Sequence, residues 1–119
     1  MSVIATRPAS QTAAIKTPTV SSSPSSTTGV DQIDTTTYQA VKWLVTVNDS
    51  VGVRVVAFEV FAAHRAGANP IHTIVNIIGD VTINYAVDVV IVGTNMVLQV
   101  TNNEAVSLTI NSTRTVVLI

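Results

Sequence analysis

The sequence predicts an all-β protein: an antiparallel β-sandwich or small barrel of about seven strands, preceded by an extended N-terminal arm. Apolar residues recur at every second position in several stretches, and Val81–Val92 is the clearest example. Turn-forming residues separate these stretches at intervals of roughly 8–12 residues, which is typical of sandwiches and barrels. No stretch is a convincing helix: residues 57–66 could be one by composition, but Val55, Val56, Phe58, Val60 and Phe61 favour a strand there.

Residues 1–37 differ in composition from the rest of the chain. Ser, Thr and Pro dominate this segment, which buries too little apolar surface to offset the entropy of ordering by itself. It is therefore either a disordered leader or an arm that becomes ordered on another subunit. Small apolar residues spaced along the segment favour the arm. The candidate arm contacts are Val3, Ile4, Ile15 and Val20.

The first three strands are expected within residues 38–78. Val or Trp occupies every second position from Val41 to Val47, which indicates a strand with one buried face. Residues 53–64 predict a second strand with two largely apolar faces, and residues 71–78 predict a third. The intervening segments, residues 48–52 and 65–70, are rich in turn-forming Asn, Asp, Gly and Pro.

Val81–Val92 predicts the longest strand, at roughly 40 Å. Its odd-numbered residues from Val81 to Ile91 lie on one face of an extended chain. Further strands are expected at residues 96–101, 106–110 and 114–119. Gly93–Asn95 and Thr101–Glu104 supply the turns between the earlier of these strands.

The part of the chain from residue 38 to residue 119 carries more apolar strand surface than one small sandwich can bury. Each sheet of a sandwich buries a single face, yet several of these strands are apolar on both. We therefore expect a second subunit to cover the other face in a homo-oligomer, most simply a trimer. The candidate interface residues are Val55, Phe61, Val87, Val89, Val90 and Ile91.

Composition excludes several classes of protein. The net charge is −1 and 11% of residues are charged, so no basic patch is available for nucleic acid. The first residues lack the apolar core of a signal peptide, and the later apolar runs are too short for a membrane helix, so no membrane partner is expected. The chain has no cysteine, which excludes disulfides and thiolate metal sites and fits a reducing cytoplasm.

We expect no catalytic residue, bound metal or cofactor. His64 and His72, with Asp80, could form part of a metal site, but two solvated histidines at a loop edge are the simpler interpretation. Glu59 and Asp88 could serve as catalytic carboxylates. A structural role is favoured instead, with solvent exposure or pairing to a cation from the set Lys42, Arg54 and Arg114. Trp43 and Tyr85 could stack on a sugar, but we expect both in the core.

Five segments occur in an order that matches a known family. They are Tyr38–Val47, Val55–Val60 with the following His64, Ala86–Val90, Leu98–Thr101 and Thr113–Val117. Together they resemble a small β domain that recurs in virion structural proteins of tailed bacteriophages. The resemblance covers about residues 37–119. The loop Arg65–Pro70 departs from it, because the family more often has an Asp-Gly type of turn there, and the segment 1–37 is additional.

The resemblance implies a non-enzymatic part of the virion, assembled in the cytoplasm of the host bacterium. A capsid decoration or cement protein is favoured, because the N-terminal arm suits anchoring to a major capsid protein or another virion protein. A tail, collar, fibre or baseplate component is the alternative. A carbohydrate-binding module is a second alternative, which requires exposed aromatic residues.

Overall fold

The structure, a computed structural model, describes residues 15–119 and is all-β, as the sequence predicts. Within the described residues, two antiparallel sheets contain nine strands, compared with the expected seven. The strands are β1 (Ile15–Lys16), β2 (Val20–Ser22), β3 (Ser26–Asp34), β4 (Tyr38–Asp49), β5 (Arg54–Arg65), β6 (Ala68–Gly79), β7 (Tyr85–Val92), β8 (Asn95–Asn102) and β9 (Leu108–Leu118). Within this range no helix is long and apolar enough to cross a membrane.

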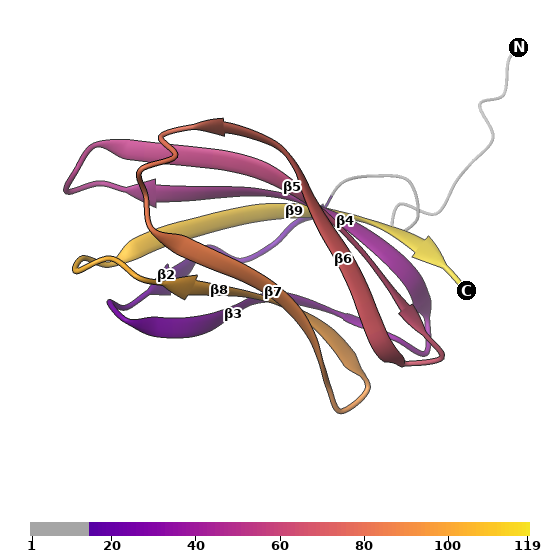
Figure 1. Ribbon diagram of the computed structural model, residues 1–119. Coiled ribbons are helices and arrows are strands. Elements are labelled where there is room, and N and C mark those ends of the chain that lie inside the picture. Colours follow the sequence, from indigo (N-terminus) through magenta and orange to yellow (C-terminus); the bar gives the residue numbers. More distant parts are fainter. Residues whose placement is uncertain (1–14) are drawn as a thin grey trace, which may run out of the picture.

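The sheets pack as two layers (Figure 1). The six-stranded sheet has the order β1-β9-β4-β5-β6, and β2 also pairs with β9. The three-stranded sheet has the order β3-β8-β7. At the centre of the larger sheet, Trp43 of β4 lies opposite Val60 of β5 and Arg114 of β9.

The core lies between the layers and follows the alternation of the sequence. In β4 the predicted buried face, every second residue from Val41 to Val47, is buried as expected. Trp43, Phe58, Met96 and Leu98 are the largest fully buried side chains. Since strands of both sheets contribute alternate residues, the core is that of a sandwich.

The described part of the predicted arm belongs to the sandwich. β1 and β2 pair with β9, β3 pairs with β8, and Val30 and Ile33 of β3 are core residues. The expected boundary at residue 37 therefore falls between two strands of one fold. The segment joins the sheets because its Ser and Thr residues still carry backbone N–H and C=O groups. These groups can pair with the open edge of a longer strand even where the side chains bury little apolar surface.

The candidate arm contacts have different outcomes. Ile15 and Val20 lie opposite Arg114 and Ile110 of the same chain, so the structure pairs them within one subunit. Val3 and Ile4 lie outside the described residues.

The long strand predicted at Val81–Val92 is shorter in the structure. β7 begins at Tyr85, and residues 80–84 form a turn that carries the chain from one sheet to the other. In this turn the Ile83 amide donates to the Asp80 carbonyl at 3.2 Å. Ile83 is still buried, whereas Val81, on the same predicted face, is 74% exposed, so the alternation predicted burial only in part where no strand forms. The sequence predicts two separate strands at residues 106–110 and 114–119, whereas the structure has one continuous strand there, β9.

Candidate interaction surface

Half of the predicted interface residues pack inside their own subunit. Val89 is a core residue with 4% of its surface exposed, and Val87 and Ile91 pack against the same core. Val90 is partly buried, whereas Val55 and Phe61 are exposed on the outer face of the six-stranded sheet. The period-two pattern identified the apolar face of β7 correctly, but the other sheet covers that face.

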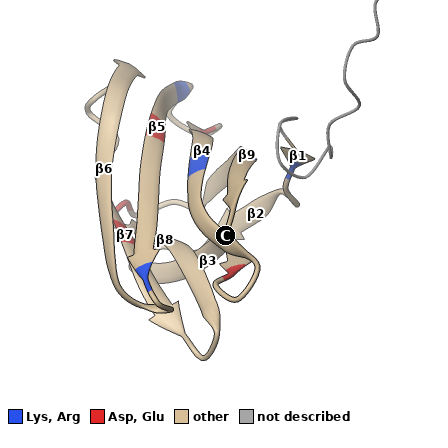
Figure 2. Ribbon diagram, turned by 90° about the vertical axis from the view of Figure 1, so that its right-hand side faces the viewer, with Lys and Arg blue, Asp and Glu red and all other residues tan. Residues whose placement is uncertain are grey.

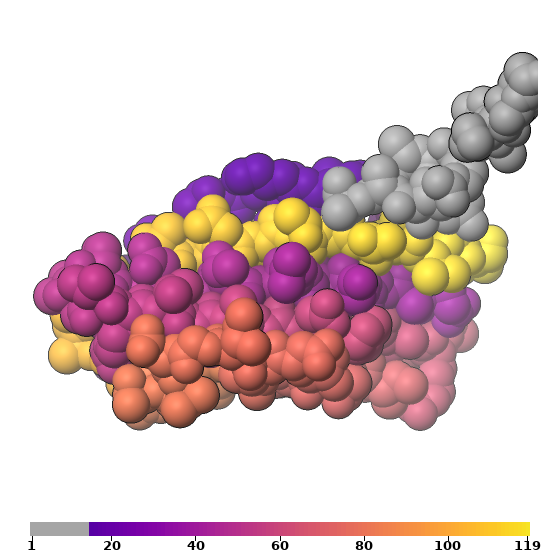
Figure 3. Space-filling model, turned by 90° about the horizontal axis from the view of Figure 1, so that it is seen from above, coloured from indigo at the N-terminus to yellow at the C-terminus, as the bar shows by residue number. Residues whose placement is uncertain are grey.

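The outer face of the six-stranded sheet contains a groove of about 610 Å³ near the start of β4. Ala40 lies opposite both Ala63 and Val117, and Ala63 lies opposite Ile71. This row across the sheet therefore has two alanines in the middle and larger apolar side chains at its ends, which leaves a hollow beside the bulkier Lys42 and Phe61 of the next row. We call this the apolar groove, and its principal lining residues are Ala40, Lys42, Phe61, Ala63, Ile71 and Val117. Figure 3 shows the outer face, with β9, β4, β5 and β6 side by side.

Exposed apolar residues gather at the opposite end of the same sheet. Val51 and Val53 in the β4–β5 turn are 74% and 87% exposed. We call the cluster the apolar tip, and it comprises Val51, Val53, Val55, Ile78 and Val81. Val53 has a φ of 54°, a conformation that a β-branched residue rarely adopts. The β4–β5 turn projects from the left end of the molecule in Figure 3.

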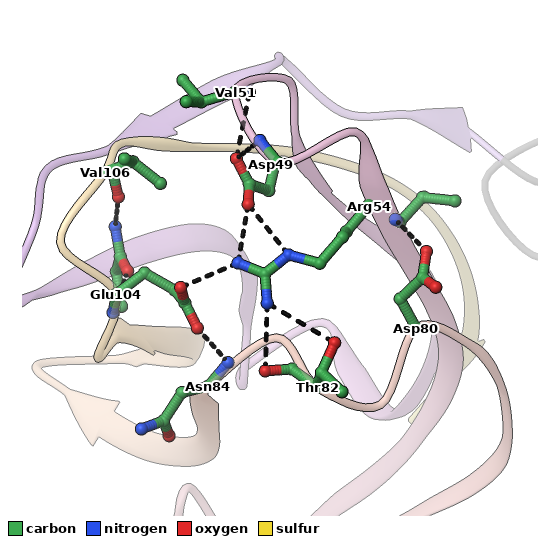
Figure 4. A network of polar contacts seen from close by, with 11 residues as sticks. Asp49, Val51, Arg54, Asp80, Thr82, Asn84, Glu104 and Val106 are labelled. Carbon is green, nitrogen blue, oxygen red and sulfur yellow. Dashed lines mark hydrogen bonds and ion pairs between the residues drawn. The ribbon is translucent and has the colours of Figure 1, made fainter.

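A polar network underlies the apolar tip (Figure 4). Arg54 Nη2 contacts Asp49 Oδ2 at 2.7 Å and Glu104 Oε1 at 2.8 Å, and Arg54 Nη1 donates to the Thr82 carbonyl at 3.2 Å. Glu104 Oε2 accepts a hydrogen bond from the Asn84 amide at 2.6 Å. One guanidinium thus joins the β4–β5 turn, the β6–β7 connection and the β8–β9 connection.

The charges in this network are stabilised by hydrogen bonds. The Gly52 amide, followed by Arg54, lowers the pKa of the Asp49 carboxyl. The Asn84 amide, followed by Arg54, lowers the pKa of Glu104. Asp49 and Glu104 lie in segments that the sequence identified only as turns. The partners of Asp49 are local, whereas Glu104 binds Arg54 and the Asn84 amide from two distant segments, so local spacing could not have found the whole network.

The two histidines that were considered for a metal site lie in different environments. His64 is 3% exposed and is therefore not solvated as expected. Its Nδ1 accepts from the Gly67 amide at 2.8 Å and its Nε2 lies 2.6 Å from the Tyr38 carbonyl. Because Nδ1 accepts, Nε2 carries the proton and donates to Tyr38. Both ring nitrogens are thereby occupied, while His72 is exposed at the rim of the apolar groove.

The two carboxylates that were considered as catalytic groups form no ion pair within residues 15–119, and Asp88 is exposed, which is the alternative that was expected. Glu59 accepts a hydrogen bond from the Asn76 amide nitrogen at 3.1 Å, and Asp88 accepts from the Val89 backbone at 2.8 Å. Arg114 instead pairs with Asp31 at 2.7 Å. Lys42 forms no ion pair with any residue from 15 to 119.

The aromatic residues singled out for sugar stacking belong mainly to the core. Trp43 is fully buried, and Tyr85 stacks on Phe58 with 5.4 Å between ring centroids. Of the aromatic side chains in the described range, Phe61 is the exposed one. Across residues 15–119, no three His, Asp or Glu side chains group closely enough to hold a metal ion.

Comparison with known proteins shows similarity of fold. No family model and no curated protein matches the sequence. The tailspike protein of Acinetobacter phage vB_ApiP_P1 matches all of this chain and 24% of its own length, with a TM-score of 0.60 and 12% identity. The tailspike protein of Acinetobacter baumannii phage AM24 matches 89% of this chain and 26% of its own length, with a TM-score of 0.55 and 9% identity. The chain thus corresponds to about a quarter of each tailspike.

Proposed function

We propose that the chain is a tail-associated structural module of a bacteriophage virion. The observation that carries this proposal is the likeness of the chain, over all of its length in one case and 89% in the other, to parts of two phage tailspike proteins. This likeness favours the tail component over the capsid decoration protein that the sequence alone suggested. It also agrees with the resemblance of residues 37–119 to a phage virion domain.

A non-enzymatic role is part of the proposal. The buried and paired polar groups have evident structural duties: the Arg54 network joins three connections, and His64 holds the β5–β6 turn against Tyr38. Among the described residues, Glu59 and Asp88 have hydrogen bonds to Asn76 and to the Val89 backbone and belong to no group of side chains that could hold a metal ion. The carbohydrate-binding alternative is weakened because Trp43 is buried.

We further propose that the module self-associates, most simply as a trimer, and contacts another virion protein. The support is the exposed apolar surface at both ends of the six-stranded sheet, which exceeds the scattered exposure usual for a monomer.

Purified parent particles provide the test of the location. Immunogold labelling is expected to mark the tail, and gel densitometry is expected to give a copy number far below that of the major capsid protein. Uniform labelling of the head at a copy number close to that of the capsid protein would restore the decoration hypothesis. Release of sugar from the host polysaccharide, abolished by Asp88→Asn, would contradict the non-enzymatic role.

A further inference from the structure

Building on the self-association proposed above, we propose that the apolar tip of one copy docks into the apolar groove of a second copy. The two surfaces belong to different ends of the same sheet, so the contact is head to tail. Each copy then uses one surface to bind its neighbour on one side and the other surface to bind its neighbour on the opposite side.

The two surfaces are too far apart to meet within one chain. The apolar groove includes Ala40 near the start of β4, and the apolar tip begins just after Asp49 at the end of β4. At 3.3 Å per residue, these ends of the strand are roughly 30 Å apart. In Figure 1 the β4–β5 turn lies at the end of the molecule opposite the C-terminus.

The shapes of the two surfaces are complementary. The β4–β5 turn protrudes and presents two valines almost fully to solvent, whereas the apolar groove is a hollow with an alanine pair between larger apolar side chains. Insertion of the valines would remove apolar surface on both sides from water, which is the main driving force of association.

The apolar tip is preorganised for docking. Asp49 Oδ1 accepts hydrogen bonds from the Val51 and Gly52 amides at 3.0 and 2.9 Å, and Arg54 holds the other carboxylate oxygen. A turn fixed in this way loses little conformational entropy when it binds. Within the turn, Val53 keeps an unfavourable left-handed conformation, a kind of strain that concentrates at functional surfaces.

The charged residues closest to the two surfaces differ: among the described residues, the lining of the apolar groove contains a lysine and no carboxylate, whereas carboxylates are in excess at the apolar tip. Asp49, Asp80 and Glu104 outnumber Arg54 at the end that carries the apolar tip. At the other end, Lys42 is the charged residue among those that line the apolar groove, and Arg65 ends β5 beside it. Two carboxylates lie farther out: Glu59 is two positions from Phe61 on the same face of β5, and Asp34 precedes Thr35, which approaches the β5–β6 turn. Figure 2 shows how sparse charged residues are along the ribbon as a whole. Lys42 in the groove and the excess of carboxylates at the apolar tip favour a head-to-tail contact and disfavour tip against tip.

The absence of cysteine in the chain makes a direct test possible. Val51→Cys labels the apolar tip and Ile71→Cys labels the apolar groove. Val92→Cys, on the end of β7 in the other sheet, is the matched control, since all three positions are exposed. Under mild oxidation, an equimolar mixture of the tip and groove variants is expected to give a mixed disulfide dimer at least about tenfold faster than either variant paired with the control.

The pattern of cross-links decides between the possible contacts. Formation of Val51→Cys or Ile71→Cys homodimers as fast as the mixed dimer would overturn the head-to-tail contact, while leaving self-association standing. A wild-type chain that stays monomeric at micromolar concentration in light scattering, with no cross-link above the control, would overturn self-association itself. The location test on particles is independent of both results.

Charge substitutions give a second, equilibrium test. Val51→Glu or Ile71→Asp is expected to raise the dissociation constant at least about thirtyfold, as for loss of an interface hot spot. Val92→Glu is expected to leave it unchanged, with circular dichroism confirming that all three variants fold. Equal effects of the three variants would contradict the proposed contact.

Discussion

At the scale of single residues, Asp31 joins the two layers of the sandwich. Its Oδ2 accepts a hydrogen bond from Trp43 Nε1 at 2.8 Å, and its Oδ1 accepts from Arg114 Nη1 at 2.7 Å. Asp31 belongs to β3 in the small sheet, whereas its partners belong to β4 and β9 in the large sheet. The side chain therefore satisfies the indole N–H of the largest core residue.

Replacement of Asp31 tests this role. Asp31→Ala leaves the buried indole N–H without an acceptor and is expected to lower the free energy of unfolding by about 2–4 kcal/mol. Asp31→Asn retains an acceptor oxygen for Trp43 and is expected to cost about 1 kcal/mol, because Arg114 is partly exposed and its ion pair is screened. Urea denaturation measures both, and equal losses would show that the indole hydrogen bond matters little.

Val53 offers a prediction with two readouts. Asn tolerates the left-handed conformation better than Val, so Val53→Asn is expected to raise the free energy of unfolding by about 0.5–1 kcal/mol. The same change removes an apolar side chain from the apolar tip and is expected to weaken self-association. Thermal unfolding and light scattering measure the two effects. If stability and self-association both rise or both fall, the result would argue against a docking role for Val53.

At the scale of elements, the junction between β5 and the end of β6 depends on close backbone approach. Gly79 has a φ of +104°, and an added Cβ would overlap the carbonyl oxygen of Val55. That carbonyl also accepts a hydrogen bond from the Asp80 amide at 2.7 Å, while Asp80 Oδ2 accepts from the Val55 amide at 3.0 Å. These contacts position the turn that leads into β7.

Two glycine substitutions separate conformational strain from steric overlap. Gly79→Ala combines both and is expected to lower the free energy of unfolding by about 2–4 kcal/mol. Gly93→Ala, at a φ of +61° with open space around the new methyl group, is expected to cost about 1 kcal/mol for strain alone. Chemical denaturation of both variants is the measurement, and a cost at Gly93 equal to that at Gly79 would remove the steric explanation.

The network between the three connections makes stability depend on pH. The folded-state pKa values of Asp49 and Glu104 lie below their ordinary values of 3.8 and 4.5. The unfolded chain therefore binds protons first as the pH falls, so the stability that these groups contribute is present above their ordinary pKa values and is lost below them. We expect the urea midpoint to decrease steadily from about pH 5 to about pH 3.

A double variant supplies the control for this titration. Asp49→Asn with Glu104→Gln removes both carboxylates and is expected to flatten the decrease between the same pH limits. Part of the slope should persist, because the Thr36 backbone amide also lowers the pKa of Asp34, which is outside the network. A slope unchanged by the double variant would show that other groups dominate the acid response.

At the scale of the whole molecule, the sandwich needs the segment that the sequence treats as an arm. β1 and β2 cover one edge of β9, and β3 supplies a third of the small sheet together with the core residues Val30 and Ile33. Ser22 and Thr17 are also buried, and Asn102 of β8 donates to the Ser22 carbonyl at 2.9 Å. The small sheet would lose one of its edges without these residues.

Two deletions test this dependence. Removal of residues 2–30 eliminates β1, β2 and part of β3, and is expected to abolish cooperative thermal unfolding of the purified chain. Removal of residues 2–14 takes away no described strand, and is expected to preserve cooperative unfolding. If both deleted chains unfold cooperatively at the wild-type temperature, the segment is an appendage after all.

The alternation of apolar and polar residues predicted burial correctly where one face of a strand packs on the core. The pattern in Val41–Val47 and in Tyr85–Ile91 identified core residues correctly, because side-chain direction in a strand alternates regardless of the partner. Alternation shows that a face is covered without showing which surface covers it, and in the structure Val87, Val89 and Ile91 pack against the core of their own chain.

By itself, therefore, the sequence determined the all-β class, the positions of the main strands and most of the core. The tertiary structure alone decided that residues 15–34 pair with β8 and β9, that Arg54 gathers Asp49 and Glu104, and that an apolar groove and an apolar tip lie at opposite ends of one sheet. The physical reason is distance along the chain. Periodicity is a property of neighbouring residues, whereas strand partners, ion pairs and hollows depend on segments brought together only when the chain folds.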